Sequence, residues 1–349
     1  SVCQPQLPLL ITSMHALATP RRFALLLTTL LLLAGLALLL ALLMGSVSIS
    51  LPGLWQDFFT SQPSISHSVL QLRLERGWLA FVTGGSLALS GALMQLLLRN
   101  PLADPYILGL SGGSAVGALL AMLLAAAAWM IDAAAFAGAL VSMALVALFA
   151  RRDLLASERL ADHSPRLLLT GVVLSAGWGA LVTLLLALAP DGQLRSMVFW
   201  LMGDLGGAEW RWWPGALLLL ALLWALRQAR SLNVLALGPT LATSLGVNVA
   251  PLRRNLFVIA ALLAATSVTT AGSIGFVGLI VPHACRMALG NDQRLLLPAC
   301  ALAGGSFLLL ADTLARTVLA PQQLPVGVLT ALIGVPLFLL QLARERRHA

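Results

Sequence analysis

"FALLLTTLLLLAGLALLLALLMG" (residues 23–45) decides the fold class of this chain, because it is a long stretch without a single charged residue. Leucine and alanine dominate it, and both residue types favour helix. A helix of about 20 apolar residues crosses a hydrocarbon core of about 30 Å. The stretch lacks the small-residue cleavage site of a secretory signal. We therefore expect it to be retained as a membrane-spanning helix.

Apolar runs of this kind recur along the whole chain. The mean hydropathy is +0.94 and only 10% of the residues are charged, whereas soluble domains average about 25%. The further runs are 78–98, 115–131, 133–150, 167–189, 214–226, 255–271, 274–290, 295–311 and 326–343. The sequence therefore predicts an all-α polytopic membrane protein with about ten transmembrane helices. We expect a single domain, because no polar segment is long enough to fold separately.

The basic residues indicate topology rather than nucleic-acid binding. All 21 are arginine, and they cluster between the apolar runs. If the N-terminus is cytoplasmic, sixteen of them fall on the cytoplasmic side, as the positive-inside rule requires. The remaining five lie on the opposite face: Arg73, Arg76, Arg195, Arg211 and Arg316. We therefore predict that both termini are cytoplasmic and that nucleic acid is not a partner.

Two of the outer arginines lie in "LQLRLERGWL" (residues 70–79), where the second apolar run begins. Arginines at the end of a membrane helix commonly extend to the lipid headgroups. The alternative is a docking site for an acidic partner. The topology alone favours contact with lipid.

A glycine-rich stretch, "RNPLADPYILGLSGGSAVGALLA" (residues 99–121), follows the second run. Gly113 and Gly117 have the spacing at which two helices approach closely. A phosphate-binding loop is the other reading, but no strand precedes the glycines and no Gly-Lys-Ser/Thr follows them. The pattern therefore favours helix packing beside a broken segment.

The link "LNVLALGPTLATSLGVNVAPLRRN" (residues 232–255) holds a short amphipathic stretch from Leu235 to Leu245. Gly238 and Pro239 break this stretch, and Gly246 ends it. It is too short to cross a membrane and too apolar for a solvated loop. It is either a helix on the membrane surface or an apolar projection that fits a cleft in a cytoplasmic partner.

In "TTAGSIGFVGLIVPHACRMALG" (residues 269–290), dense glycine and proline predict a kinked or discontinuous helix. His283 has no His or carboxylate three or four residues away. We therefore interpret it as an interfacial histidine rather than a proton relay or metal ligand. We predict no catalytic residue and no metal site, because no nucleophile–base pair and no His-Glu-x-x-His occurs.

Together these stretches resemble the permease subunits of binding-protein-dependent ABC importers for iron-siderophores, haem and vitamin B12, and most closely the vitamin B12 members. The motifs that carry the resemblance are Arg73-x-x-Arg76, "SGALMQ" (90–95), "NPLADP" (100–105), "LALG" (235–238), "GSIGFVGLIVPH" (272–283), "LLLADTLAR" (308–316) and "LPVGVLTALIGVP" (324–336). One position departs from the family pattern. Glu75 stands where the family usually has proline, so the local backbone and the positive charge of this region are both expected to differ.

The resemblance implies a type II importer permease in the bacterial inner membrane. The expected domains are a cytoplasmic N-terminal segment (1–22), a transmembrane permease domain (23–343) with a coupling region near 232–255, and a cytoplasmic tail (344–349). The expected partners are a second copy of the chain, two cytoplasmic ATPase subunits, a periplasmic substrate-binding protein and membrane lipid. The chain binds no cofactor itself, and ATP and Mg²⁺ belong to the ATPase.

The resemblance also assigns residues to three sites, and it shifts the reading of the outer arginines from lipid contact to docking. Binding-protein docking is expected at Arg73, Arg76 and Arg316. Coupling to the ATPase is expected at Leu235, Leu237, Gly238, Leu241, Leu245 and Gly246, and a cytoplasmic gate at His163, Ser164 and Pro165. The cargo remains open among ferric siderophore, haem and cobalamin.

The alternative function is an ion-coupled secondary transporter. Such a protein needs ionisable residues at mid-membrane. The candidates are Asp132, Asp204 and Asp312, and all three lie near the ends of apolar runs. The sequence therefore favours the importer.

Overall fold

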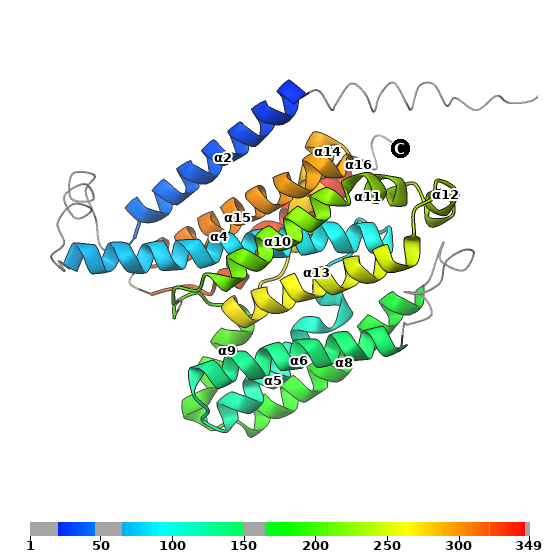
Figure 1. Cartoon of the computed structure of the whole chain (residues 1–349). Helices are drawn as coiled ribbons and strands as arrows, with labels where there is room; N and C mark the ends of the chain where they lie inside the picture. The colour runs from blue at the N-terminus through cyan, green and yellow to red at the C-terminus, as the bar shows by residue number, and fades with distance from the viewer. Residues whose placement is uncertain (1–19, 46–64, 150–164, 208, 321, 346–349) are drawn as a thin grey trace, which may run out of the picture.

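The structure is a computed structural model that describes residues 20–45, 65–149, 165–207, 209–320 and 322–345. These residues form helices joined by short links and contain no strand. Figure 1 shows the long helices running side by side in one bundle. The predicted all-α class is confirmed.

In the described residues, six helices are long and apolar enough to cross a membrane. They are α2 (Pro20–Leu43), α4 (Ile65–Leu98), α6 (Ala128–Phe149), α8 (Pro165–Leu188), α13 (Val249–Ala271) and α15 (Gln293–Thr317). A seventh span is formed if α10 (Trp213–Arg227) and α11 (Ala229–Ala236) are joined across their 67° bend. Three shorter apolar helices match the other predicted runs: α5 (Leu110–Leu123), α14 (Val277–Leu289) and α16 (Val326–Glu345).

Three further elements are short. They are the 3-10 turn η1 (Pro105–Leu108), α9 (Asp191–Met202) and α12 (Pro239–Ser244). The sequence did not predict α9, which begins with charged and polar residues and is too short to span a membrane. Its last turn contacts the start of the α13–α14 link, where a side chain in place of Gly272 would strike the Trp200 carbonyl.

The centre of the bundle is the contact between α4 and α15. The apolar span of α4 is 89% buried, whereas that of α2 is only 11% buried and faces outward. Gly84 lies directly against Gly304, and a side chain on either residue would collide with backbone of the other. Phe81 covers Gly305 one turn away. Because the two backbones are in direct contact here, α4 and α15 form one closely packed pair.

Small residues also join α5 to α6. A side chain at Gly113 would meet Gly138, and one at Gly117 would meet Ala134. The predicted role of these glycines in helix packing is therefore confirmed.

Two predicted boundaries differ most from the structure. The second run was expected to begin at residue 78, but α4 begins at Ile65, so "LRLERG" lies inside the helix and does not open it. The third run was expected to reach residue 131, but α5 ends at Leu123 and α6 begins at Ala128. Both errors come from hydropathy, because charges do not stop a helix and the apolar link of residues 124–127 (LAAA) looks like part of one.

The break predicted near residues 269–290 is present. α13 ends at Ala271, and Gly272 has a φ of 69°. Phe276 then precedes α14 with a left-handed φ of 70°. The chain therefore turns back between two helices here rather than continuing as one.

Candidate functional site

Arg73 is held at the end of the bundle where α2 ends and α4 begins. Its Nη1 donates to the carbonyl oxygen of Leu42 at 2.6 Å and to that of Leu43 at 3.5 Å. The last carbonyls of a helix have no partner within it and carry partial negative charge. Arg73 therefore closes the C-terminus of α2, and its side chain is buried.

Arg76, one turn further along α4, binds Asp312 of α15 with two of its nitrogens. Arg76 Nε lies 3.1 and 2.9 Å from the two carboxylate oxygens, and Nη2 lies 2.8 Å from Oδ1. Its Nη1 donates to Gln323 Oε1 at 2.8 Å. Asp312 is only 1% exposed. A carboxylate this deeply buried is stable because a cation and several hydrogen bonds compensate its lost hydration.

Arg316 completes this group from the next turn of α15. Its Nε lies 3.9 Å from Asp312 Oδ2, and its Nη2 donates to the Ala41 carbonyl of α2. We call Arg73, Arg76, Asp312, Arg316 and Gln323 the arginine cluster. It ties α2, α4 and α15 together at one end of the bundle.

The structure thus brings together the three arginines that the sequence predicted as one docking site. It also shows an internal role for each, which the sequence did not predict. Docking of an acidic partner stays a prediction. Glu75 accepts a hydrogen bond from Gln71 at 2.9 Å, and α4 continues unbroken through it.

Sequence reasoning missed Asp312 and Gln323 as members of this site. Asp312 did carry a signal, since a lone carboxylate in an apolar run with arginine four residues later predicts an ion pair. Its stronger partner, Arg76, is 236 residues away and carries no local signal. Gln323 lies in a link and carries none either.

The other end of the bundle holds the segment formed by α11 and α12, residues 229–246 (Figure 1). Gly238, with a φ of 129°, separates the two helices, and Gly246, with a φ of 81°, follows α12. Residues other than glycine rarely adopt either angle. The predicted amphipathic stretch, its break and its end are therefore confirmed.

The leucines of this segment divide into two groups. Leu235 is buried and packs in the core of the bundle. Leu237, Leu241 and Leu245 are 58%, 45% and 61% exposed. These three form an apolar surface beyond the end of the bundle, whereas Leu235 holds the segment in place and does not belong to that surface.

The predicted gate lies mostly outside the described residues. His163 and Ser164 are not among them, and Pro165 is the first residue of α8. The gate stays a prediction.

The three remaining ionisable candidates are not grouped for chemistry. His283 is buried, and its ring and that of Phe338 are nearly perpendicular, with 6.1 Å between their centroids. Asp132 forms an ion pair with Arg211 at 2.6 Å, and Asp204 accepts from the backbone of Gly206. Among the described residues, no three His, Cys, Asp or Glu side chains lie close enough to hold a metal.

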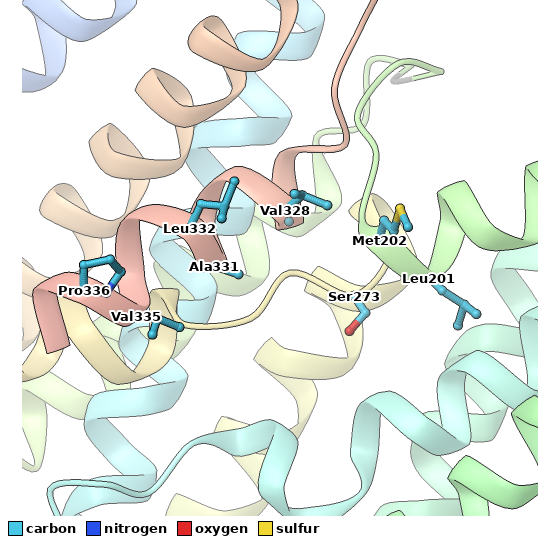
Figure 2. A pocket seen from close by; sticks show the side chains of 9 residues that line it. Leu201, Met202, Ser273, Val328, Ala331, Leu332, Val335 and Pro336 are labelled. Carbon is cyan, nitrogen blue, oxygen red and sulfur yellow. The ribbon is translucent and has the colours of Figure 1, made fainter. Parts of the chain in front are cut away.

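An open apolar cavity of about 530 Å³ lies between α9, the α13–α14 link and α16 (Figure 2). It is lined by Leu201, Met202, Ser273, Gly327, Val328, Ala331, Leu332, Val335 and Pro336. Ser273 supplies the one hydroxyl of this lining. Such a surface offers weak, non-directional contact and no ligand set for tight binding.

Residues 30–344 match the FecCD transport family. The vitamin B12 import system permease proteins BtuC of Escherichia coli and Shigella boydii are each 42% identical to this chain over 316 residues. Each alignment covers 89% of this chain and 93% of the relative.

Solved structures agree with this match. A metal-chelate type ABC transporter in an inward-facing conformation has a TM-score of 0.79 and 34% identity, covering 91% of this chain and 98% of its own. PsaBC from Streptococcus pneumoniae has a TM-score of 0.55 at 18% identity, covers 77% of this chain and 90% of its own, and shares the fold alone.

Proposed function

Because this chain belongs to the FecCD transport family, we propose that it is the permease subunit of an ATP-binding-cassette importer that moves a bulky metal chelate from periplasm to cytoplasm. The observation that carries the proposal is the similarity to vitamin B12 import permeases along nearly the whole chain. The chelate is a ferric siderophore, haem or cobalamin, and the vitamin B12 relatives favour cobalamin. The protein acts in the bacterial inner membrane with both termini in the cytoplasm.

The chain supplies the path, and other subunits supply energy and cargo. It contains no Gly-x-x-x-x-Gly-Lys-Ser/Thr sequence, so we assign ATP and Mg²⁺ to two separate cytoplasmic ATPase subunits. A second copy of the chain completes the path. A periplasmic binding protein delivers the chelate.

We assign binding-protein docking to the arginine cluster. Arg76 is the most accessible of its ion-paired arginines, since 12% of its side chain remains exposed beside Gln323. The positive potential of the cluster would steer and orient a partner with acidic side chains, and salt would weaken the effect.

We assign ATPase coupling to the apolar surface of Leu237, Leu241 and Leu245. Three exposed leucines on a segment that the bundle itself does not cover suit a cleft in a soluble partner. Gly238 and Gly246 fix the angles of this segment, and Leu235 anchors it.

We assign part of the chelate path to the cavity of Figure 2 and its inner closure to His163, Ser164 and Pro165. An apolar wall with one hydroxyl suits a cargo that must leave again, because tight binding belongs to the binding protein. Ser164 and Pro165 are small residues, which suit two chains that meet at a dimer axis.

The ion-coupled alternative has less support. Asp312 and Asp132 are both engaged by arginines, so neither is poised to exchange a proton with a passing substrate. Purification of the tagged chain from membranes in mild detergent separates the two functions. An ATPase subunit should co-purify with the chain if the chain is an importer permease, and should not if it is an ion-coupled transporter.

Reconstitution then identifies the cargo. Proteoliposomes containing the complex, with ATP on the ATPase side, are supplied with the binding protein and with labelled cobalamin, haem or ferric siderophore. ATP-dependent uptake of one of them supports the proposal. Uptake driven by a proton or sodium gradient without ATP would refute it.

A further inference from the structure

Asn233 of α11 connects the α11–α12 segment to the first turn of α15. Its Nδ2 donates to the Asp292 carboxylate at 2.9 Å, and its Oδ1 accepts from the backbone N–H of Gln293 at 2.8 Å. The neighbours fix the orientation of this amide, because a flipped side chain would set donor against donor and acceptor against acceptor.

Asp292 strengthens this connection. It is the N-cap residue of α15, and its Oδ1 also accepts from the backbone N–H of Arg294 at 3.0 Å. The first N–H groups of a helix lack partners within it and carry partial positive charge. Asn233 and Asp292 therefore share the capping of α15, although they come from different helices.

The far end of the same helix lies in the arginine cluster. α15 has 25 residues and is about 37 Å long. It packs against α4 through Gly84 and Gly304 along its middle. Asp312, near its other end, holds Arg76. Pro298 removes one backbone hydrogen bond near the Asp292 end of α15, but the close packing of α15 on α4 lets a displacement at either end be transmitted along the helix.

We propose that Asn233 is a positioning residue of transport, which fastens the α11–α12 segment to α15 so that the two move as one unit. The inference rests on the proposed function, because it gives the coupling surface a defined connection to the membrane helices. This role requires no contact between Asn233 and cargo or nucleotide. Asn233 acts by fixing where Leu237 and Leu241 are presented.

The segment does not depend on Asn233 to fold. Leu232 and Leu235 flank it in α11, and both are buried in the core. Loss of the amide should therefore loosen the link between α11 and α15 while α11 stays in place.

The test exchanges the two side chains. Asn233→Asp sets a second carboxylate against Asp292. Combining it with Asp292→Asn restores every hydrogen bond. The amide introduced at position 292 donates to the carboxylate introduced at position 233 and accepts from the Arg294 N–H, while that carboxylate accepts from the Gln293 N–H. The matched control is Asn291→Asp, which adds the same negative charge beside Asp292. Asn291 is exposed, and its side chain is not part of the hydrogen bonds between Asn233 and the first turn of α15.

The first readout is cargo transported per ATP hydrolysed in proteoliposomes. We expect Asn233→Asp to lower this ratio about tenfold, the size of effect that loss of a hydrogen bond to a charged group produces. Asn291→Asp should stay within about twofold and the exchanged pair within about threefold of the unaltered protein. Equal losses in Asn233→Asp and Asn291→Asp, or no recovery in the exchanged pair, would overturn the inference.

A second readout does not require the partners. Nitroxide labels on cysteines introduced at Leu241 and Leu310, both exposed, report the distance between α12 and α15 in the purified full chain with its native cysteines replaced. We expect one narrow distance distribution in the unaltered protein and in the exchanged pair, and a broad one in Asn233→Asp. Identical distributions would refute the link even if the importer itself is real. If the distance distributions are narrow and broad as expected but the complex shows no ATP-driven uptake, only the proposed function is refuted.

Discussion

Replacing Asp312 with alanine should destabilise the protein strongly. The carboxylate is 1% exposed, and its removal leaves Arg76 and Arg316 without their shared anion, with side chains only 12% and 9% exposed. Breaking a buried ion pair by removing one partner costs about 3–5 kcal/mol. Arg76 keeps its hydrogen bond to Gln323 and Arg316 keeps its bond to Ala41, so we expect the lower end, about 3 kcal/mol.

The assay is reversible unfolding in mixed micelles with increasing SDS, followed by tryptophan fluorescence. Asp132→Ala is the matched control, because Asp132 also pairs with an arginine, at 2.6 Å, but both side chains are about a quarter exposed. An exposed pair contributes only about 0–1 kcal/mol. If Asp312→Ala costs no more than Asp132→Ala, the arginine cluster is solvated and our description of it is wrong.

Three further predictions concern transport. Reversing Arg73 and Arg76 to Glu should abolish stimulation of ATP hydrolysis by the loaded binding protein. Because this change also breaks the Arg76–Asp312 pair, Asp312→Ala, which loses the same pair and keeps both arginines, is the control and should retain stimulation. Equal losses in both variants, or unchanged stimulation and salt dependence, would show that these arginines do not dock. Leu241→Asp should lower transport about tenfold or more, because it places a charge on the apolar coupling surface, while the amount of protein in the membrane stays the same. Undiminished uptake would show that this surface does not couple to the ATPase. Ser164→Cys in a cysteine-free background should cross-link across the dimer in one nucleotide state only, and cross-linking independent of state would contradict a moving gate.

Hydropathy was enough to predict the bundle. Runs of leucine and alanine without charge have no stable alternative in a bilayer, and the expected spans match the described long and short apolar helices. Glycine was equally informative in the α11–α12 segment, because Gly238 and Gly246 take backbone angles that few other residues adopt. Local chemistry thus predicted where helices form and where the α11–α12 segment breaks and ends, but not the start of α4 or the end of α5.

Contacts between distant segments were not predictable in the same way. Arg76 meets Asp312, and Asn233 meets Asp292, only after the bundle has packed. The sequence placed the three arginines at the same end of the bundle, but it did not show that their guanidinium groups bind partners within the chain. Leu235 illustrates the same limit, because only the packed bundle shows that Leu235 faces the core whereas Leu237 faces outward.

The length of α4 has a consequence for the lipid around this protein. Its 34 residues measure about 51 Å, whereas the hydrocarbon core is about 30 Å thick. Even a tilt of about 40°, the upper end of the usual range, leaves a vertical rise of about 39 Å. Residues 77–98 of α4 carry no charge and measure about 33 Å, which matches the hydrocarbon core, so the charged first turns extend into the headgroup layer together with Arg73 and the end of α2 that it caps. Acyl-chain length then sets how deeply these groups sit, so thinner bilayers present them to the aqueous phase and thicker ones draw them toward the hydrocarbon.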